Sequence, residues 1–326
     1  MLNNAVSTRR SLLGAGLCVI ASRHLTGETR YVERSAFSAP ASGGLSKWRH
    51  GSLVSVEKRN PAAPTFTLAG ANGAISSQFT FALPSVNRIW VHDFDLDVTG
   101  AVVFCGKCYS SEGQLAPYVA IRPLQSEKIS VIRTAPFVAY MVSVAPDATI
   151  YTVGLESVNG HPSGEGSSPN GDVVRRFDRS GGLIRSAFPR LQLSRAALRT
   201  ESGYLAVTSN RVGWYSPVDG EGVYVEMSPD LRSSKVYAGL PSSLGFGMVL
   251  GFALTESGGA YLTYSSYSGS ADRPTFTLDR QANRWAQIPL PTTVGGESSW
   301  VLKGEENGML VLRGEKALHF VAPVNE

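Results

Sequence analysis

The sequence predicts an all-β protein, and within that class a β-propeller of six four-stranded blades. The composition, the recurrence of strand–turn–strand patterns and the spacing between them lead to this prediction. Of the 326 residues, 34 are glycine, 43% are hydrophobic and only 17% are charged. Gly, Ser, Thr, Val and Tyr outweigh Glu, Lys and Ala in most windows, which is typical of strands and turns. The hydrophobic content is in the globular range and excludes disorder as the main state.

One strand–turn–strand pattern recurs about every 50 residues, which is the scale of a repeat architecture. Copies such as DFDLDVTGAVVF and FALTESGGAYLTY have two apolar segments around a polar turn, as a hairpin does. The first copy, WRHGSLVSVE, is degraded. The six turns centre on Gly51, Gly100, Asp147, Gly203, Gly258 and Gly308.

A second hairpin pattern follows each of the first five turns by about 26 residues. Two hairpins per repeat make one four-stranded antiparallel sheet, which cannot bury both of its faces alone. Copies must therefore pack face to face, and radial packing of such sheets is a β-propeller. The copies are FTLAGANGAISSQF, YVAIRPLQSEKISVI, VVRRFDRSGGLIRSAF, YVEMSPDLRSSKVYAGL and FTLDRQANRWAQIPL.

The last repeat ends with ALHFVAPV and lacks an outermost strand. We expect the strand-like run RYVERSAF, residues 30–37, to close this sixth blade, because an open ring would leave an exposed edge. Five blades are the alternative, since the copy around Gly51 has a weak first strand. A β-sandwich or a parallel β-helix fits the regular units of paired hairpins less well.

The segment VVRRFDRSGGLIRSAF has an apolar strand, Phe-Asp, a glycine turn and another strand. In this it resembles the blades of NHL-type and related six-bladed propellers. The resemblance covers most of residues 45–324 and rests on a motif that several propeller families share. It implies the fold and no chemistry, because propellers include binding proteins, enzymes and scaffolds.

The N-terminus predicts an export signal. Arg9 and Arg10 precede a short apolar run, and TRRSLL resembles a bacterial twin-arginine signal, with general secretion as the alternative. Cys18 suggests lipidation, but Leu17 stands where a lipoprotein signal takes a small residue. We therefore expect an exported protein, periplasmic or extracellular, with a signal over 1–21, a linker and closing strand over 22–44, and one propeller domain over 45–326.

Several other classes of protein lack support in the sequence. The net charge of +4 is slight for this length, so no nucleic-acid footprint is visible. No window of eighteen apolar residues exists, so no transmembrane helix is predicted. The chain has no GxSxG, no P-loop, no dinucleotide fingerprint and no HExxH.

Three predicted connections between second and third strands are long, at residues 107–117, 156–171 and 265–274, and a fourth at 214–222 is aromatic. Long loops on one face of a rigid scaffold often carry binding, and Ser, Gly, Asn and Tyr suit recognition. Solvated loops without a partner are the alternative. The predicted ligand-binding face comprises His92, Asp93, Tyr109, His161, Trp214, Tyr264 and Tyr267.

Cys105 and Cys108 form the only CxxC. After removal of the signal they are the only cysteines, and an oxidising compartment favours a disulfide between them that staples the following loop. A redox pair is less favoured, because Cys105 ends a predicted strand instead of starting a helix. Free thiols are the remaining option, and a zinc site lacks its other ligands.

His92 and Asp93 lie where an inner strand begins, close to the predicted channel mouth. Strand alternation puts Asp93, Asp95 and Asp97 on one face, where three carboxylates suit Ca²⁺. We favour a structural role instead, with Asp97 in a turn and Asp95 capping backbone groups between blades. If the chain holds a metal, Asp93 is the candidate ligand.

Most tryptophans lie inside predicted strands, so we interpret them as packing between blades and not as a sugar-binding platform. They are Trp48, Trp90, Trp214, Trp285 and Trp300.

We predict from these observations an exported, non-catalytic propeller that binds a protein, peptide or glycan through its long-loop face, without a cofactor. The alternative is a metal-dependent hydrolase or lactonase with Ca²⁺ or another divalent cation at the central channel. The counterparts of Asp93 at other inner-strand starts include Arg195 and Trp300, which do not bind cations. That mismatch counts against the enzyme. A redox protein that uses the two cysteines is a third hypothesis.

Overall fold

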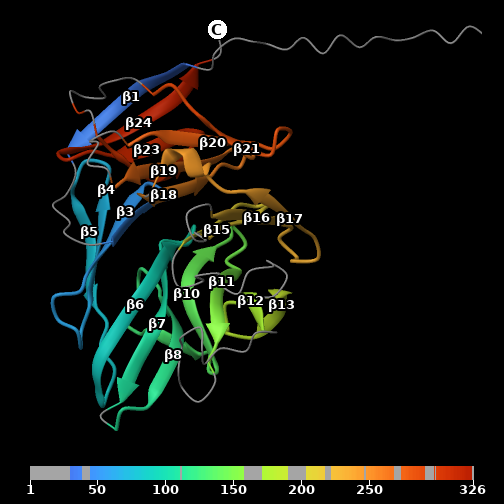
Figure 1. Ribbon diagram of the computed structural model, residues 1–326. Helices are drawn as coiled ribbons and strands as arrows, with labels where there is room; N and C mark the ends of the chain where they lie inside the picture. The colour runs from blue at the N-terminus through green and yellow to red at the C-terminus, as the bar shows by residue number, and fades with distance from the viewer. Residues whose placement is uncertain are drawn as a thin grey trace, which may run out of the picture.

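A computed structural model of the chain describes residues 30–38, 45–110, 112–157, 171–189, 203–216, 222–245, 247–267, 273–290, 297 and 299–324. Within these residues, 24 strands form six four-stranded antiparallel sheets, which are arranged as the blades of a β-propeller (Figure 1). The predicted fold class and the number of blades are confirmed, and the five-blade alternative is wrong.

We number the blades in chain order and give the strands of each from the channel outward. Blade 1 comprises β2 (Leu45–Arg49), β3 (Ser52–Glu57), β4 (Thr65–Gly70) and β5 (Ile75–Thr80). Blade 2 comprises β6 (Val86–Leu96), β7 (Val102–Ser110), β8 (Leu115–Arg122) and β9 (Ser130–Arg133). Blade 3 comprises β10 (Phe137–Val144), β11 (Ile150–Glu156), β12 (Asp172–Phe177) and β13 (Leu183–Pro189).

The second half of the chain repeats this arrangement. Blade 4 comprises β14 (Tyr204–Val207), β15 (Val212–Ser216), β16 (Val223–Met227) and β17 (Ser234–Ala238), followed by a short 3₁₀ helix, η2 (Ser242–Leu244). Blade 5 comprises β18 (Gly247–Leu254), β19 (Ala260–Ser266), β20 (Thr275–Asp279) and β21 (Arg284–Gln287). Blade 6 comprises β22 (Val301–Glu306), β23 (Met309–Arg313), β24 (Ala317–Val324) and β1 (Arg30–Ser38).

The inner hairpins turn where the sequence predicts, with one exception. Gly100 and Gly258 have φ angles of 79° and 97°, which glycine adopts without strain. Asp97 accepts hydrogen bonds from the N–H groups of Thr99 and Ala101, which confirms its place as a turn residue.

The exception is the copy around Gly203. There β14 begins only at Tyr204, and its hairpin closes with a hydrogen bond from the Thr208 N–H to the Arg211 carbonyl. The predicted turn around Gly203 is therefore wrong, because the first hairpin of this blade turns after β14 and not before it. The polar run TESG before YLAV has the composition of a hairpin turn, which makes the inner strand β14 resemble the second strand of a hairpin.

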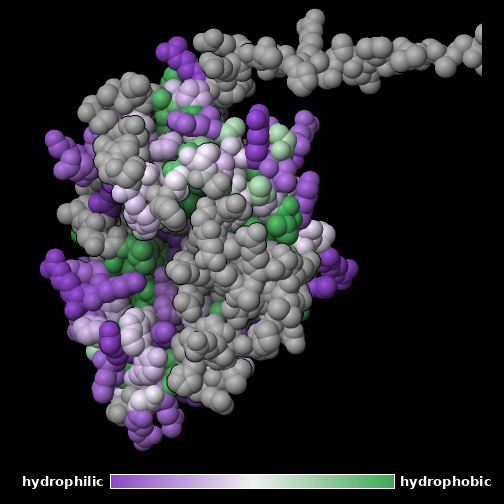
Figure 2. Space-filling view, in the orientation of Figure 1, coloured by the Kyte–Doolittle hydropathy of each residue, from purple (hydrophilic) through white to green (hydrophobic). Residues whose placement is uncertain are grey.

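The hydrophobic core is divided between the blades. Each sheet has two apolar faces, and in the described residues six buried clusters fill the six spaces between neighbouring blades. Figure 2 shows hydrophilic side chains projecting around the edge of one face, with hydrophobic ones visible in patches between them. The interpretation of tryptophan as inter-blade packing is confirmed for Trp48, Trp214, Trp285 and Trp300.

The ring closes through the N-terminal strand, as predicted. β1 pairs antiparallel with β24 (Figure 1), from Arg30 opposite Val324 to Ser38 opposite Ala317. Across this pair, the imidazole Nδ1 of the fully buried His319 lies 2.9 Å from the Glu33 carboxylate. Chain ends far apart in sequence are thus joined by a ladder and by one buried polar contact.

The predicted signal over residues 1–21 and Cys18 lie outside the described residues, and so does most of the linker. None of the helices in the described part of the chain has the length and the apolar character that crossing a bilayer requires.

Candidate functional site

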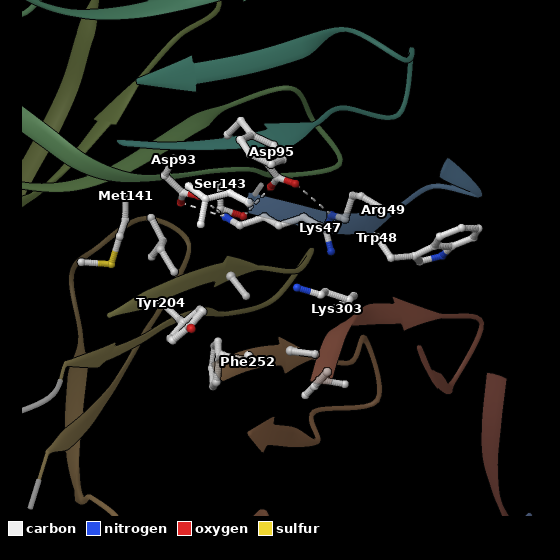
Figure 3. A pocket seen from close by; sticks show the side chains of 18 of the residues that line it. Lys47, Trp48, Arg49, Asp93, Asp95, Met141, Ser143, Tyr204, Phe252 and Lys303 are labelled. Atoms are coloured by element: carbon white, nitrogen blue, oxygen red, sulfur yellow. Dashed lines mark hydrogen bonds and ion pairs between the residues drawn. The ribbon is translucent and has the colours of Figure 1, made fainter. Parts of the chain in front are cut away.

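The six inner strands surround a cavity of about 270 Å³ in the central channel. Every inner strand contributes to its wall, so the cavity belongs to the whole ring. Figure 3 shows side chains from several blades pointing into it, among them Lys47, Tyr204 and Lys303. The structure brings His92 and Asp93 to this cavity, while their role in ligand binding stays a prediction.

Counted over the described residues, four inner strands carry a β-bulge whose extra residue lines the cavity, and β6 carries a second bulge at Asn87, which does not line it. A bulge places one extra residue on a strand, which locally re-aims its side chain. In β6, for example, Val91 pairs with Gly106 and Asp93 with Cys105, so that His92 is the extra residue. The bulged residues that line the cavity are His92 in β6, Tyr140 in β10, Leu250 in β18 and Lys303 in β22.

Two of these bulges are followed by glycines that let the inner strands approach one another. A Cβ atom on Gly251 of β18 would lie 1.9 Å from the Leu302 carbonyl oxygen of β22. A Cβ on Gly304 of β22 would lie 2.2 Å from the Trp48 carbonyl oxygen of β2. Only glycine fits at either position, and the close approach fixes the two bulges.

Asp93 joins β6 to both of its neighbours. Its carboxylate lies 2.7 Å from the Lys47 ammonium of β2 and accepts a hydrogen bond of 3.0 Å from the Val142 N–H of β10. Burial raises the pKa of Asp93, and the adjacent Lys47 opposes this rise. The carboxylate is therefore already engaged on two sides.

Asp95 also caps β10, as the sequence analysis favours. It accepts hydrogen bonds from the Ser143 hydroxyl at 2.7 Å and the Val144 N–H at 2.9 Å. The Arg49 guanidinium lies 3.8 Å away and donates to the Val144 and Val207 carbonyls at 3.3 and 2.7 Å. Among the described residues, no group of three or more His, Cys, Asp or Glu side chains is placed to hold a metal ion.

His92 is a neutral imidazole at ordinary pH. Burial is the main reason that its pKa falls to about 4, and repulsion from Lys107 and Lys58 adds to it. Its Nδ1 lies 2.9 Å from the Ala139 carbonyl oxygen, so the neutral ring carries its proton there and donates it. Nε2 is then a hydrogen-bond acceptor. The ring stacks on Tyr140 with a centroid separation of 4.8 Å.

Lys303 is one of several residues of this cavity that the sequence analysis missed, with Lys47, Arg49, Tyr140 and Leu250. Its ammonium extends from β22 into the space between the inner strands (Figure 3). Burial lowers its pKa to about 8, and repulsion from Arg313 and Arg273 adds to this. The described residues give it no carboxylate partner, in contrast to Lys47, which pairs with Asp93.

The predicted disulfide between Cys105 and Cys108 is wrong, because both are buried free thiols. They lie three residues apart on β7 and therefore point to opposite faces of the sheet. Cys105 packs between blades 2 and 3, and Cys108 packs between blades 1 and 2. Burial raises the pKa of both thiols, which makes them poor nucleophiles.

Two residues of the predicted binding face are core residues, and this part of the prediction is wrong. Trp214 is fully buried between blades 3 and 4. Tyr264 is 7% exposed and donates a hydrogen bond to the Gly245 carbonyl at 2.8 Å. The prediction has Trp214 in the loop at 214–222 and Tyr264 directly before the loop at 265–274, but Trp214 lies within β15 and Tyr264 within β19.

The other predicted face residues are placed differently. Tyr109 is half-buried and packs edge-on against Trp90 at 4.9 Å. Tyr267 is 66% exposed. The roles of these two tyrosines stay predictions. His161 and most of the loops at 156–171 and 265–274 lie outside the described residues.

The fold and the channel define the class, because six blades around one cavity make this chain a six-bladed β-propeller. No model of a protein family matches it, and no curated protein matches its sequence. Among solved structures it is similar to a protein of Bacteroides fragilis that is described as an exported protein, with a TM-score of 0.53 and 10% sequence identity. That match covers 91% of this chain and 98% of the other, and at this identity it shows the fold alone.

Two further structures show weaker similarity. TolB from Acinetobacter baumannii has a TM-score of 0.46 at 15% identity over 84% of this chain, and the match spans 64% of the TolB chain. The β-propeller domain of the trilobed protease from Pyrococcus furiosus has a TM-score of 0.42 at 14% identity, over 75% of this chain and 68% of the other. The resemblance to NHL-type propellers stays a prediction.

Proposed function

We propose that this chain is an exported, non-catalytic β-propeller that binds a protein, peptide or glycan through the face on which its channel and long loops open. The observation that carries the proposal is the cavity lined by four bulged residues. A bulge leaves a residue outside the strand ladder, and such features concentrate where a side chain must be aimed at a ligand. Bulges on four inner strands that aim into one cavity support a binding site there.

The chemistry of the cavity favours binding over catalysis. Asp93 and Asp95 are engaged by Lys47, Arg49 and the backbone of β10. A general base needs a free lone pair near its substrate together with a pKa near the working pH. His92 has the free nitrogen, but its pKa of about 4 makes it a weak base.

Export is the second part of the proposal. It rests on the arginine pair and the apolar run of residues 1–21. Fractionation of cells that express the full chain, with Arg9 and Arg10 both changed to Lys in a parallel culture, tests it. Wild-type protein in the cytoplasmic fraction would contradict export, and unchanged export of the variant would favour general secretion over the twin-arginine route.

The alternative, a hydrolase with a divalent cation, requires that Lys47 leave Asp93. Elemental analysis of natively purified protein tests this. A stoichiometric divalent ion that is lost in Asp93→Asn would overturn the proposal of a cofactor-free binding protein.

The binding site itself is tested by filling the cavity. Leu250→Trp places a large side chain in the channel, while Val236→Trp adds the same group at a position on β17 that is 44% exposed. We expect wild type and Val236→Trp to recover the same partner from envelope extract, and Leu250→Trp to lose it. Equal recovery by all three would contradict a channel site. Shortening residues 158–170 and 268–272 tests the contribution of the loops separately.

A further inference from the structure

The cavity holds three basic side chains, and two of them have acidic partners. Lys47 pairs with Asp93 at 2.7 Å, and Arg49 lies 3.8 Å from Asp95. Lys303 has neither a hydrogen bond nor an ion pair with the described residues. A half-buried ammonium without a partner is unfavourable for the folded protein by itself, so its presence in a cavity indicates an anionic ligand.

None of the described charged groups around Lys303 forms an ion pair with its ammonium, so a ligand can supply the opposite charge. Arg313 of β23 and Arg273, which precedes β20, both repel it. Glu305 lies two residues further along β22, where the N–H of Gly308 donates to its carboxylate. The remaining charged groups that line the same cavity are Lys47, Arg49, Asp93 and Asp95, which form the two pairs described above.

The cavity also limits the shape of the ligand. Its volume of about 270 Å³ is below the usual range for whole small-molecule ligands, so it admits the end of a chain or one or two side chains. Sugar rings bind on open aromatic faces, but the Tyr140 ring is stacked against His92. The other aromatic residues that line the cavity are part of the clusters between blades or pack against them, namely Trp48, Phe94, Tyr204 and Phe252. The Nε2 of His92 accepts a hydrogen bond, which a peptide N–H can supply. These features favour an extended peptide over a glycan.

We propose that the channel binds an extended peptide through a carboxylate group that pairs with Lys303. This inference rests on the proposed binding function and names the chemistry of the ligand. A C-terminal carboxylate and an Asp or Glu side chain offer the same group, and the test separates them.

The probes are N-acetyl-trialanine as the free acid, the same peptide as the amide, N-acetyl-Ala-Asp-Ala-amide, and sodium acetate. The Lys303 Cε signal is followed by NMR in ¹³C-lysine-labelled full chain and assigned by its loss in Lys303→Met. We expect at least one carboxylate peptide to shift this signal at millimolar concentration and to raise the pKa of Lys303 above 8, because a bound anion favours the ammonium form. The free acid and the Asp peptide distinguish the two sources of the carboxylate.

Three variants complete the test. Lys303→Met should weaken binding of the carboxylate peptide by about tenfold or more, the effect expected for loss of a charge-assisted hydrogen bond. Lys128→Met removes the same charge from an exposed loop of blade 2 and should leave binding unchanged. Lys303→Arg should keep binding and remove its decline above pH 8, because guanidinium does not titrate there.

Two results would overturn the inference, namely a Lys303 signal that no carboxylate peptide moves, or equal binding by Lys303→Met and wild type. Binding of acetate as tight as that of the peptides would overturn the peptide part. Partner recovery separates the two proposals. If Leu250→Trp loses the partner and Lys303→Met retains it, the binding function stands and the role of Lys303 is wrong.

Discussion

Two arcs of the channel wall hold neighbouring inner strands together by different means. In the charged arc, which comprises β2, β6 and β10, ionic groups join the strands, because Asp93 and Asp95 cap β10 and pair with basic groups of β2. In the glycine arc, which comprises β18, β22 and β2, the strands are joined by close backbone contact at Gly251 and Gly304. The first arc uses its ionic groups for structure. In the second, the Glu306 carboxylate of β22 accepts hydrogen bonds from the Trp48 indole and the Gly51 N–H, whereas Lys303 makes no such contact with the described residues and is available for a ligand.

Breaking the glycine arc has the largest expected effect. Gly304→Ala would place a Cβ atom 2.2 Å from the Trp48 carbonyl oxygen, a backbone atom that cannot move without shifting β2. We expect a loss of more than about 4 kcal/mol of unfolding free energy, or failure to fold. Urea unfolding followed by tryptophan fluorescence measures it.

The control is Gly171→Ala, whose Cβ would meet only the flexible Glu156 side chain, at 3.2 Å. It should cost less than about 1 kcal/mol. Equal costs for the two substitutions would show that the close approach between β22 and β2 does not hold the ring.

Breaking the charged arc comes second. Asp95→Ala removes the acceptor for Ser143 and Val144 and leaves the Arg49 guanidinium in the channel wall without its carboxylate. Loss of one partner of a buried pair costs about 3 kcal/mol. Asp147→Ala, which removes an exposed turn carboxylate that accepts from the Thr149 N–H, is the matched control and should cost about 1 kcal/mol or less. Thermal denaturation of both variants at pH 7 decides whether Asp95 stabilises the arc.

The third effect depends on pH. The folded-state pKa of His92, about 4, lies below its unfolded value of about 6.5, so acid protonates the unfolded chain first. Stability must then fall as pH drops from about 6.5 toward 4. We expect wild type to lose about 2 kcal/mol more than His92→Gln between pH 7 and pH 4.5. Parallel pH profiles for the two proteins would show that the imidazole is not held neutral at the bulge.

The blades were predictable from sequence because their determinants are local. Alternation and turn glycines such as Gly100 and Gly258 are visible in short windows, and the need to close the ring predicts the strand at 30–37. An inserted residue inverts an alternating pattern, but inner strands such as β10 are buried on both faces and show no alternation to invert, so the bulges were missed. A signal was present, since Gly251 and Gly304 are glycines inside strands, which suggest a bulge or a close approach.

The error at the cysteines has the same origin. Cys105 and Cys108 are three positions apart, and on one continuous strand that spacing points them to opposite faces. The disulfide was predicted because Cys108 was placed in the loop that starts at residue 107, whereas β7 continues to Ser110. β7 extends this far because it pairs with β8 on one side, up to Tyr109 opposite Leu115, and with β6 on the other, up to Ser110 opposite Val86. The polar residues from Lys107 onward have the composition of a loop and do not show this pairing.

The smallest effect expected at pH 7 has the opposite sign and separates the two arcs most clearly. Lys303 carries an unpaired ammonium, and its folded-state pKa of about 8 lies below the unfolded value of about 10.4. Between these values the unfolded chain holds a proton that the folded chain has released, so wild type should gain stability as pH rises from 8 to 10.

Lys303→Met should lack this gain and should be about 1 kcal/mol more stable than wild type at pH 7. Lys128→Met should follow wild type at every pH. Chemical denaturation at pH 7 and pH 10 measures both differences, and a Lys303→Met protein less stable than wild type at pH 7 would place Lys303 with the structural ions of the charged arc. A residue whose removal stabilises the fold while weakening a ligand is retained for the ligand, which is the relation that a binding site has to its scaffold.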